Sequence, residues 1–111
     1  MDLQLKDKVV IVTGGAKGIG EGIVRVLAKE GAIPVILGRN AQDNQKLADD
    51  IIAGGGQVFQ VVAELTKPAD SAKAIEQILE KFGRIDGLVN NAGVNDGIGL
   101  ENGNYEGFVE S

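Results

Sequence analysis

A glycine-rich turn lies between an apolar run and a helix-patterned segment near the start of the chain. It reads Thr13-Gly14-Gly15-Ala16-Lys17-Gly18-Ile19-Gly20 and follows Val9-Val10-Ile11-Val12. A parallel strand, a glycine turn and a helix N-terminus in this order form an anion site, because peptide N–H groups and the helix dipole face the anion. Gly14, Gly18 and Gly20 leave room for a diphosphate against bare backbone. The turn therefore predicts dinucleotide binding.

Strand and helix patterns alternate along the chain. We expect strands at Val9–Val12, Pro34–Leu37, Gln57–Ala63 and Ile85–Val89. We expect a first helix at Gly18–Glu30, stopped by Gly31. A second helix is expected to begin after an N-cap at Asn40 and to stop at Gly54. A third is expected to begin after an N-cap at Thr66, with Pro68 in its first turn, and to stop at Gly83. Pro34 is expected at the first strand position, where a missing N–H is tolerated.

Helical crossovers between successive strands require a parallel sheet, and their handedness places helices on both faces. The predicted fold class is α/β, a doubly wound parallel sheet of the Rossmann type, with only its first four β/α units in this chain. The last of these strands would lack a neighbour on one side, and an exposed apolar edge favours aggregation.

Composition excludes several classes of function. The chain has 111 residues, a net charge of −5, no cysteine and no histidine. A disulfide framework, a thiolate nucleophile and the commonest metal ligands are therefore absent, and no metal site is expected. The lysines and arginines form no basic stripe, so we expect no nucleic-acid partner. No apolar run reaches membrane length and the start is no secretory signal, so we expect a cytoplasmic protein without membrane contact.

A second motif, Asn90-Asn91-Ala92-Gly93, stands at the end of the fourth expected strand. Together with Thr-Gly-x-x-x-Gly-Ile-Gly at Thr13 to Gly20, it resembles the short-chain dehydrogenase/reductase family over the whole chain. A finer similarity to sugar dehydrogenases of the L-fucose dehydrogenase type is carried by residues 1–5, 30–36 and 88–97.

The resemblance implies an NAD(P)-dependent oxidoreductase that transfers a hydride between a nicotinamide cofactor and a hydroxyl or carbonyl substrate, with a sugar such as L-fucose as the expected substrate. A ketoacyl or steroid-like carbonyl is the alternative within the family. A dinucleotide-binding module without chemistry is the alternative from another class. Family members commonly form dimers and tetramers, so a homo-oligomer is expected of a full-length protein.

The resemblance also implies the cofactor-binding residues. Those expected beside the diphosphate and its ribose are Gly14, Gly18, Ile19 and Gly20. Those expected beneath the ribose on the nicotinamide side are Asn91, Ala92 and Gly93, with Asn90 bracing the fourth strand against Thr13. Glu64-Leu65 stands where the family usually has Asp and an apolar residue, and its carboxylate would accept a hydrogen bond from the adenine amino group across one extra methylene.

The choice between NADP and NAD depends on the end of the second expected strand. An acidic residue about 20 positions after the glycine turn would bind the ribose 2′-hydroxyl of NAD. This chain has Gly38-Arg39 there. Arg39 offers a planar guanidinium suited to a 2′-phosphate, and Lys17 adds a second positive charge. NADP is therefore favoured, while NAD stays open because arginine also stacks on adenine.

The catalytic Tyr-x-x-x-Lys pair of the family has no match in this sequence. Tyr105 is the single tyrosine, and Val109 stands four residues after it. Tyr105 is interpreted as a helix-packing residue, and Ser111 has no partner base. We expect no catalytic residue here. Residues 1–111 are interpreted as the truncated N-terminal cofactor-binding part of a single Rossmann domain, inactive by itself.

Overall fold

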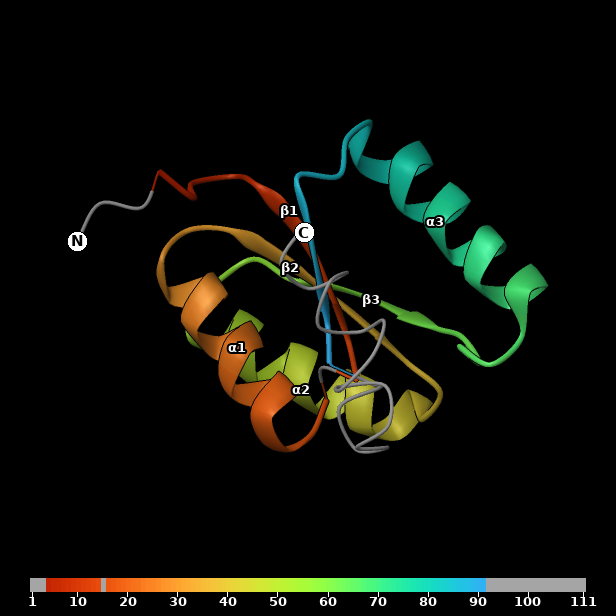
Figure 1. Cartoon of the computed structure of the whole chain (residues 1–111). Helices are drawn as coiled ribbons and strands as arrows, with labels where there is room; N and C mark the ends of the chain where they lie inside the picture. Colours follow the sequence, from red (N-terminus) through yellow and green to blue (C-terminus); the bar gives the residue numbers. More distant parts are fainter. Residues whose placement is uncertain (1–3, 15, 92–111) are drawn as a thin grey trace, which may run out of the picture.

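The computed structural model of the chain describes residues 4–14 and 16–91. Helices and strands alternate in the order β1 (Val9–Thr13), α1 (Gly18–Lys29), β2 (Ile33–Gly38), α2 (Ala41–Ala53), β3 (Phe59–Val62), α3 (Pro68–Phe82) and β4 (Gly87–Asn90). The strands form one parallel sheet in the order β3-β2-β1-β4 (Figure 1). The prediction of a doubly wound α/β sheet is confirmed for this part of the chain.

The sheet has a hydrophobic core on each face. Helix α3 covers one face and helices α1 and α2 cover the other (Figure 1). Side chains of a strand alternate between faces, so Val9 and Ile11 of β1 pack toward α3 while Val12 packs toward α1 and α2. All five residues of β1 are buried. A strand covered on both faces is apolar throughout, which explains the unbroken run at the start of the chain.

The expected helix signals at Asn40, Pro68, Gly31, Gly54 and Gly83 are confirmed, and the one at Thr66 is wrong. The side chain of Asn40 caps α2 by accepting the Asp43 N–H at 2.9 Å, and Gly31 follows α1 with φ of 88°. Thr66 does not cap α3, because the N-cap is Lys67. Thr66 instead lies in a turn before α3, which the Lys67 N–H closes on the Glu64 carbonyl at 3.0 Å, and its hydroxyl donates to Glu64 Oε1 at 3.2 Å.

The position of Pro34 also differs from the prediction. Strand β2 begins one residue earlier, at Ile33, and lies between β1 and β3. The Ile33 N–H donates to Lys8 on the β1 side at 2.8 Å, so the nitrogen of Pro34 faces the β3 side. Pairing with β3 starts only at Val35. The proline is tolerated inside β2 because its missing N–H lies beyond the end of the neighbouring strand.

Asp86 sets the register between β4 and β1. Its N–H donates to the Val9 carbonyl at 2.7 Å, and its carboxylate accepts the Val9 N–H at 2.8 Å. Arg84 donates to the same carboxylate at 2.7 Å. The resulting register pairs Val10 with Gly87 at one end and Thr13 with Asn90 at the other. Asp86 therefore brings the end of β4 beside the end of β1, where the glycine turn begins.

The stability that Asp86 provides should depend on pH. The hydrogen bond from Arg84, followed by that from the Val9 N–H, lowers the pKa of Asp86 from its ordinary value of 3.8. A carboxylate whose pKa falls on folding stabilises the native state above the unfolded pKa and loses that effect as the pH falls through the folded pKa. We expect Asp86→Asn to lower the free energy of unfolding at neutral pH. The difference from wild type should shrink as the pH drops below 3.8.

Chemical denaturation followed by circular dichroism over this pH range checks the prediction. Asp49→Asn, which removes one exposed carboxylate from α2, is the matched control for the change in net charge. A difference between wild type and Asp86→Asn that stays constant on acidification would contradict it.

Candidate functional site

The glycine turn between β1 and α1 presents bare backbone at a helix N-terminus. Gly14 and Gly18 have φ of 65° and 56°, a conformation that side chains other than glycine adopt at a cost. A Cβ atom on Gly18 would meet nothing within 4 Å. Lys17 is the N-cap of α1 and makes no capping hydrogen bond through its side chain. The first turn of α1 therefore has no side-chain cap for its N–H groups, which suits an anion.

Helix α1 approaches the turn so closely that position 20 admits no side chain. A Cβ atom on Gly20 would collide with the Gly14 carbonyl oxygen and would lie 2.8 Å from Asn91 Nδ2. Gly20 is itself buried. Gly20 does not line the cleft described below, and its missing side chain allows the close contact between helix and turn.

A hydrogen-bond network joins the end of β4 to the turn. The Thr13 hydroxyl lies 3.1 Å from Asn90 Oδ1 and accepts the Asn91 N–H at 2.9 Å. Asn91 Nδ2 donates to the Gly14 carbonyl at 3.3 Å, and the Gly14 N–H donates to Leu37 of β2 at 2.9 Å. The predicted brace between Asn90 and Thr13 is therefore present. The turn is held by both strands that flank β1.

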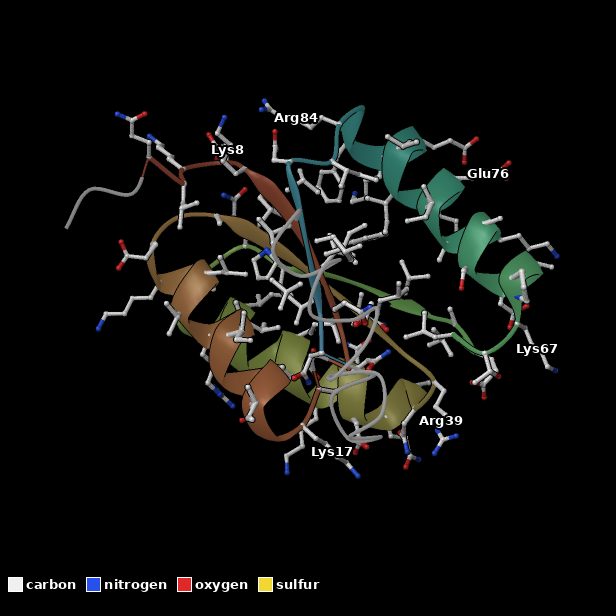
Figure 2. The ribbon with its side chains drawn as sticks, in the orientation of Figure 1. Lys8, Lys17, Arg39, Lys67, Glu76 and Arg84 are labelled. Carbon is white, nitrogen blue, oxygen red and sulfur yellow. The ribbon has the colours of Figure 1, made fainter. Side chains whose placement is uncertain are left out.

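The predicted residues meet at one cleft of about 680 Å³ at the carboxyl ends of the strands. This is the edge of the sheet where the chain reverses its winding direction, the usual ligand position in such sheets. Predicted residues that line it are Gly14, Lys17, Gly18, Ile19, Arg39, Glu64, Leu65 and Asn91. Figure 2 shows Lys17 and Arg39 at this edge, away from Lys8 and Arg84. Ala92 and Gly93 lie outside the described residues.

Both predicted cations face carboxylates in the cleft. Lys17 Nζ lies 3.1 Å from Asp43 Oδ2, and Arg39 Nη1 lies 4.0 Å from Glu64 Oε2. The side chains of Lys17 and Arg39 are 77% and 81% exposed. Pairs between such exposed groups are weak, so both cations are free to move toward a bound anion.

Glu64 and Leu65 contribute to the cleft in different ways. Glu64 Oε1 lies 3.2 Å from the Thr66 hydroxyl and 3.4 Å from the Thr66 nitrogen. Leu65 packs partly buried against the core on the α3 face. Glu64 thus reaches the cleft with a carboxylate already accepting local hydrogen bonds, and Leu65 forms an apolar part of the wall.

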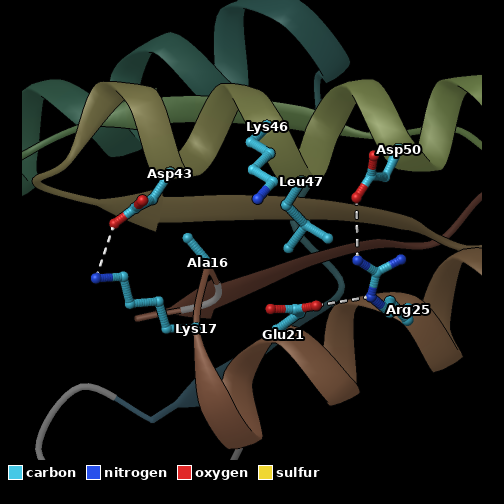
Figure 3. A pocket seen from close by; sticks show the side chains of 8 residues that line it. All are labelled: Ala16, Lys17, Glu21, Arg25, Asp43, Lys46, Leu47 and Asp50. Carbon is cyan, nitrogen blue, oxygen red and sulfur yellow. Dashed lines mark hydrogen bonds and ion pairs between the residues drawn. The ribbon is translucent and has the colours of Figure 1, made fainter.

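A smaller groove of about 300 Å³ runs between α1 and α2 beside the cleft (Figure 3). Lys17 and Asp43 line both cavities. Farther along the groove, Arg25 bonds to Glu21 at 2.9 Å and to Asp50 at 3.2 Å. The hydrogen bonds to Glu21 and then to Asp50 raise the pKa of Arg25, so this guanidinium stays charged. Opposite charges alternate along the groove.

Sequence reasoning missed Asn44, which is fully buried beside the cleft. Its Nδ2 lies 3.1 Å from the Gly38 carbonyl and 3.5 Å from that of Val61, so the side chain ties the ends of β2 and β3 together. Its Oδ1 lacks a partner in the described part of the chain. A Cβ atom on Gly38 would lie 3.0 Å from this oxygen, so Asn44 favours a bare position 38.

The sequence did contain a signal for Asn44. It stands three, four and seven residues before the buried apolar residues of α2, which are Leu47, Ala48 and Ile51. An asparagine on the apolar stripe of a helix is a candidate for a buried, hydrogen-bonded role.

No helix of the described residues is long and apolar enough to cross a membrane. Within residues 4–14 and 16–91, no group of three or more His, Cys, Asp or Glu side chains is placed to hold a metal ion.

The sheet order and the turn at its reversal point define an α/β protein of the Rossmann class. The family described as short chain dehydrogenase matches residues 8–108. The oxidoreductase UcpA of Escherichia coli is 45% identical over 91 residues, which are 82% of this chain and 34% of UcpA. The chain therefore belongs to the short-chain dehydrogenase family.

Two further matches extend this result. Hydroxynaphthalene reductase arp2 of Aspergillus fumigatus is 37% identical over 97% of this chain and 40% of its own length. A metagenomic short-chain oxidoreductase, solved in complex with NADP, superposes with a TM-score of 0.76 at 34% identity over 79% of this chain and 40% of that chain. The chain spans between a third and two fifths of the length of these three proteins.

Replacing either of two glycines of α1 by alanine should change the free energy of unfolding, in opposite directions for the two positions. Gly20→Ala places a Cβ atom against the Gly14 carbonyl, and overpacking of this kind costs about 1–3 kcal/mol. Gly22→Ala is the matched control, because a Cβ atom there meets nothing within 4 Å and alanine favours a helix by about 0.5–1 kcal/mol. Urea denaturation of both variants measures the difference. Equal effects of the two substitutions would mean that α1 does not pack tightly against the turn.

Proposed function

We propose that this chain binds NAD(P) in the cleft and forms the cofactor-binding part of an oxidoreductase that transfers a hydride between nicotinamide and a hydroxyl or carbonyl substrate. One observation carries the proposal: the uncapped N-terminus of α1 opens onto the cleft beside the bare backbone of Gly18. A diphosphate there would accept hydrogen bonds from the first N–H groups of the helix and would gain from its dipole.

The other cleft residues would hold the rest of the cofactor. Ile19, a residue that is 69% exposed, would cover the ribose next to the diphosphate. Glu64 and Leu65 would form the adenine subsite, with the carboxylate accepting from the amino group. Asn91, fixed by its bond to Gly14, would lie beneath the ribose on the nicotinamide side, together with Ala92 and Gly93.

The bound nicotinamide would supply the hydride chemistry, and the residues of this chain would bind and orient it. Tyr105 lies outside the described residues and lacks the lysine four positions later. The described cleft residues include no tyrosine–lysine pair that could move a proton to or from a substrate. We therefore assign binding, and no proton transfer, to this part of the protein.

We also propose NADP as the preferred cofactor. Arg39 and Lys17 would face its 2′-phosphate, and the bare Gly38 presents no carboxylate that would repel it. The related metagenomic oxidoreductase solved with NADP supports this choice. NAD is the alternative cofactor, bound with arginine stacked on the adenine.

The substrate proposal has two branches. A sugar of the L-fucose type rests on the similarity at residues 1–5, 30–36 and 88–97 alone. An aromatic, ketoacyl or steroid-like carbonyl compound is favoured by the relative named as a hydroxynaphthalene reductase. Screening aldoses with NADP and carbonyl compounds with NADPH, using the full-length gene product, separates the two branches.

Replacing Arg39 tests the proposal and the choice of cofactor together. Wild-type protein should bind both NADP and NAD in calorimetric titrations. The proposed function would be refuted if it bound neither cofactor. Arg39→Asp should lower the affinity for NADP by about tenfold or more and the affinity for NAD much less, because a charge-assisted contact to the phosphate becomes a repulsion. Arg39→Gln, which removes the charge without adding one, should show a smaller loss of the same sign. Equal losses for both cofactors would remove Arg39 as a phosphate ligand.

The 111-residue chain by itself should give no turnover. Its described cleft can hold a cofactor but offers no acid–base pair, and general acid–base catalysis typically contributes about 10²–10⁴-fold in rate. Absorbance of NADPH measured with NADP and a panel of sugars should therefore stay at the level of the blank. Formation of NADPH by the pure chain would show that residues outside the Tyr-x-x-x-Lys pattern move the proton.

A further inference from the structure

We propose that Asp43 is a specificity-determining residue, whose carboxylate competes with the 2′-phosphate of NADP for Lys17 and so limits the preference for NADP over NAD. This inference rests on the proposed binding of NAD(P) in the cleft. It concerns a residue that belongs to neither the glycine turn nor the end of β2.

The position of Asp43 allows this competition. Asp43 lies in the first turn of α2, where Asn40 accepts its N–H at 2.9 Å. Its Oδ2 lies 3.1 Å from Lys17 Nζ, across the gap between α1 and α2 (Figure 3). The Asp43 side chain is 31% exposed and that of Lys17 is 77% exposed. The carboxylate is thus the fixed member of the pair, and the lysine is the member that moves.

The charges around the cleft explain why Asp43 would matter for one cofactor only. Lys17 and Arg39 carry two positive charges, and the facing carboxylates of Asp43 and Glu64 carry two negative charges. A 2′-phosphate must therefore attract Lys17 away from a carboxylate that also repels the phosphate itself. A 2′-hydroxyl carries no charge, so the affinity for NAD would depend little on Asp43.

A structural reason for keeping a carboxylate at position 43 also exists. An acidic side chain in the first turn of a helix interacts favourably with the helix dipole. Asp43 thus stabilises α2 and at the same time weakens the attraction for a phosphate. Both effects come from the same charge, and asparagine at this position removes it with little change in shape.

Titration of Asp43→Asn with both cofactors tests the proposal. We expect NADP to bind about threefold to tenfold more tightly and NAD to change less than about twofold, with the gain shrinking at high salt. Adenosine 2′,5′-bisphosphate should show the same gain, and 5′-AMP should not, because only the former carries the 2′-phosphate. Binding constants from calorimetry are the readout, so no turnover is needed.

The chain offers a matched control in the same groove. Asp50 also pairs with a cation, Arg25 at 3.2 Å, but it lines the groove without lining the cleft. Asp50→Asn removes the same charge and should leave the ratio of NADP to NAD affinity unchanged. The gain in NADP affinity that Asp43→Asn causes should be smaller when Lys17 is already replaced, that is, when Lys17→Met/Asp43→Asn is compared with Lys17→Met. The reason is that the lysine that the phosphate would recruit is gone.

Failure of this inference differs from failure of the proposed function. Wild-type protein that binds neither cofactor overturns both. Wild-type protein that binds both cofactors, with a ratio that Asp43→Asn leaves unchanged or shifts no more than Asp50→Asn does, overturns the inference alone. A full gain that persists without Lys17 would also overturn it, since direct repulsion would then account for the effect.

Discussion

The contact between the N-terminal turn of α1 and the end of β1 supports the rest of the site. Gly20 lies against the Gly14 carbonyl because position 20 carries no side chain. The same carbonyl accepts a hydrogen bond from Asn91, and Thr13 bonds to the backbone of that residue. Since three strand ends meet at this turn, the direction of the helix N-terminus is set by the sheet. An anion site formed from backbone N–H groups requires such rigidity, because the groups have no side-chain torsions with which to adapt.

The cleft combines this fixed backbone site with side chains that are free to move. Lys17 and Arg39 are largely exposed and each lies near a carboxylate. Exposed pairs of this kind contribute little to stability, so their rearrangement on binding costs little. Affinity for the diphosphate would thus depend on the backbone, while discrimination between cofactors would depend on the balance of mobile charges. The two properties can be altered separately by substitution.

Most of the fold could be predicted from local sequence. The strands near Val9 and Val35 are apolar because they are covered on both faces, and the cap at Asn40 acts within its own helix turn. Errors arose where a distant or competing partner decided the outcome. Thr66 lies in a turn before α3 and donates its hydroxyl proton to Glu64, and Pro34 is tolerated inside β2 because the pairing with β3 begins only at Val35. Neither outcome follows from propensity alone.

The sequence by itself determined the alternation of strands and helices, the bare turn and the identity of its glycines, because these depend on residues close together in the chain. Only the tertiary structure decided which charges meet. Lys17 precedes α1 and Asp43 lies in α2, far from it in sequence, yet the two side chains meet across one groove. Asn44 joins β2 to β3 only because the sheet places those strand ends side by side. Contacts between elements depend on how helices pack on the sheet, and that packing is a property of the whole fold.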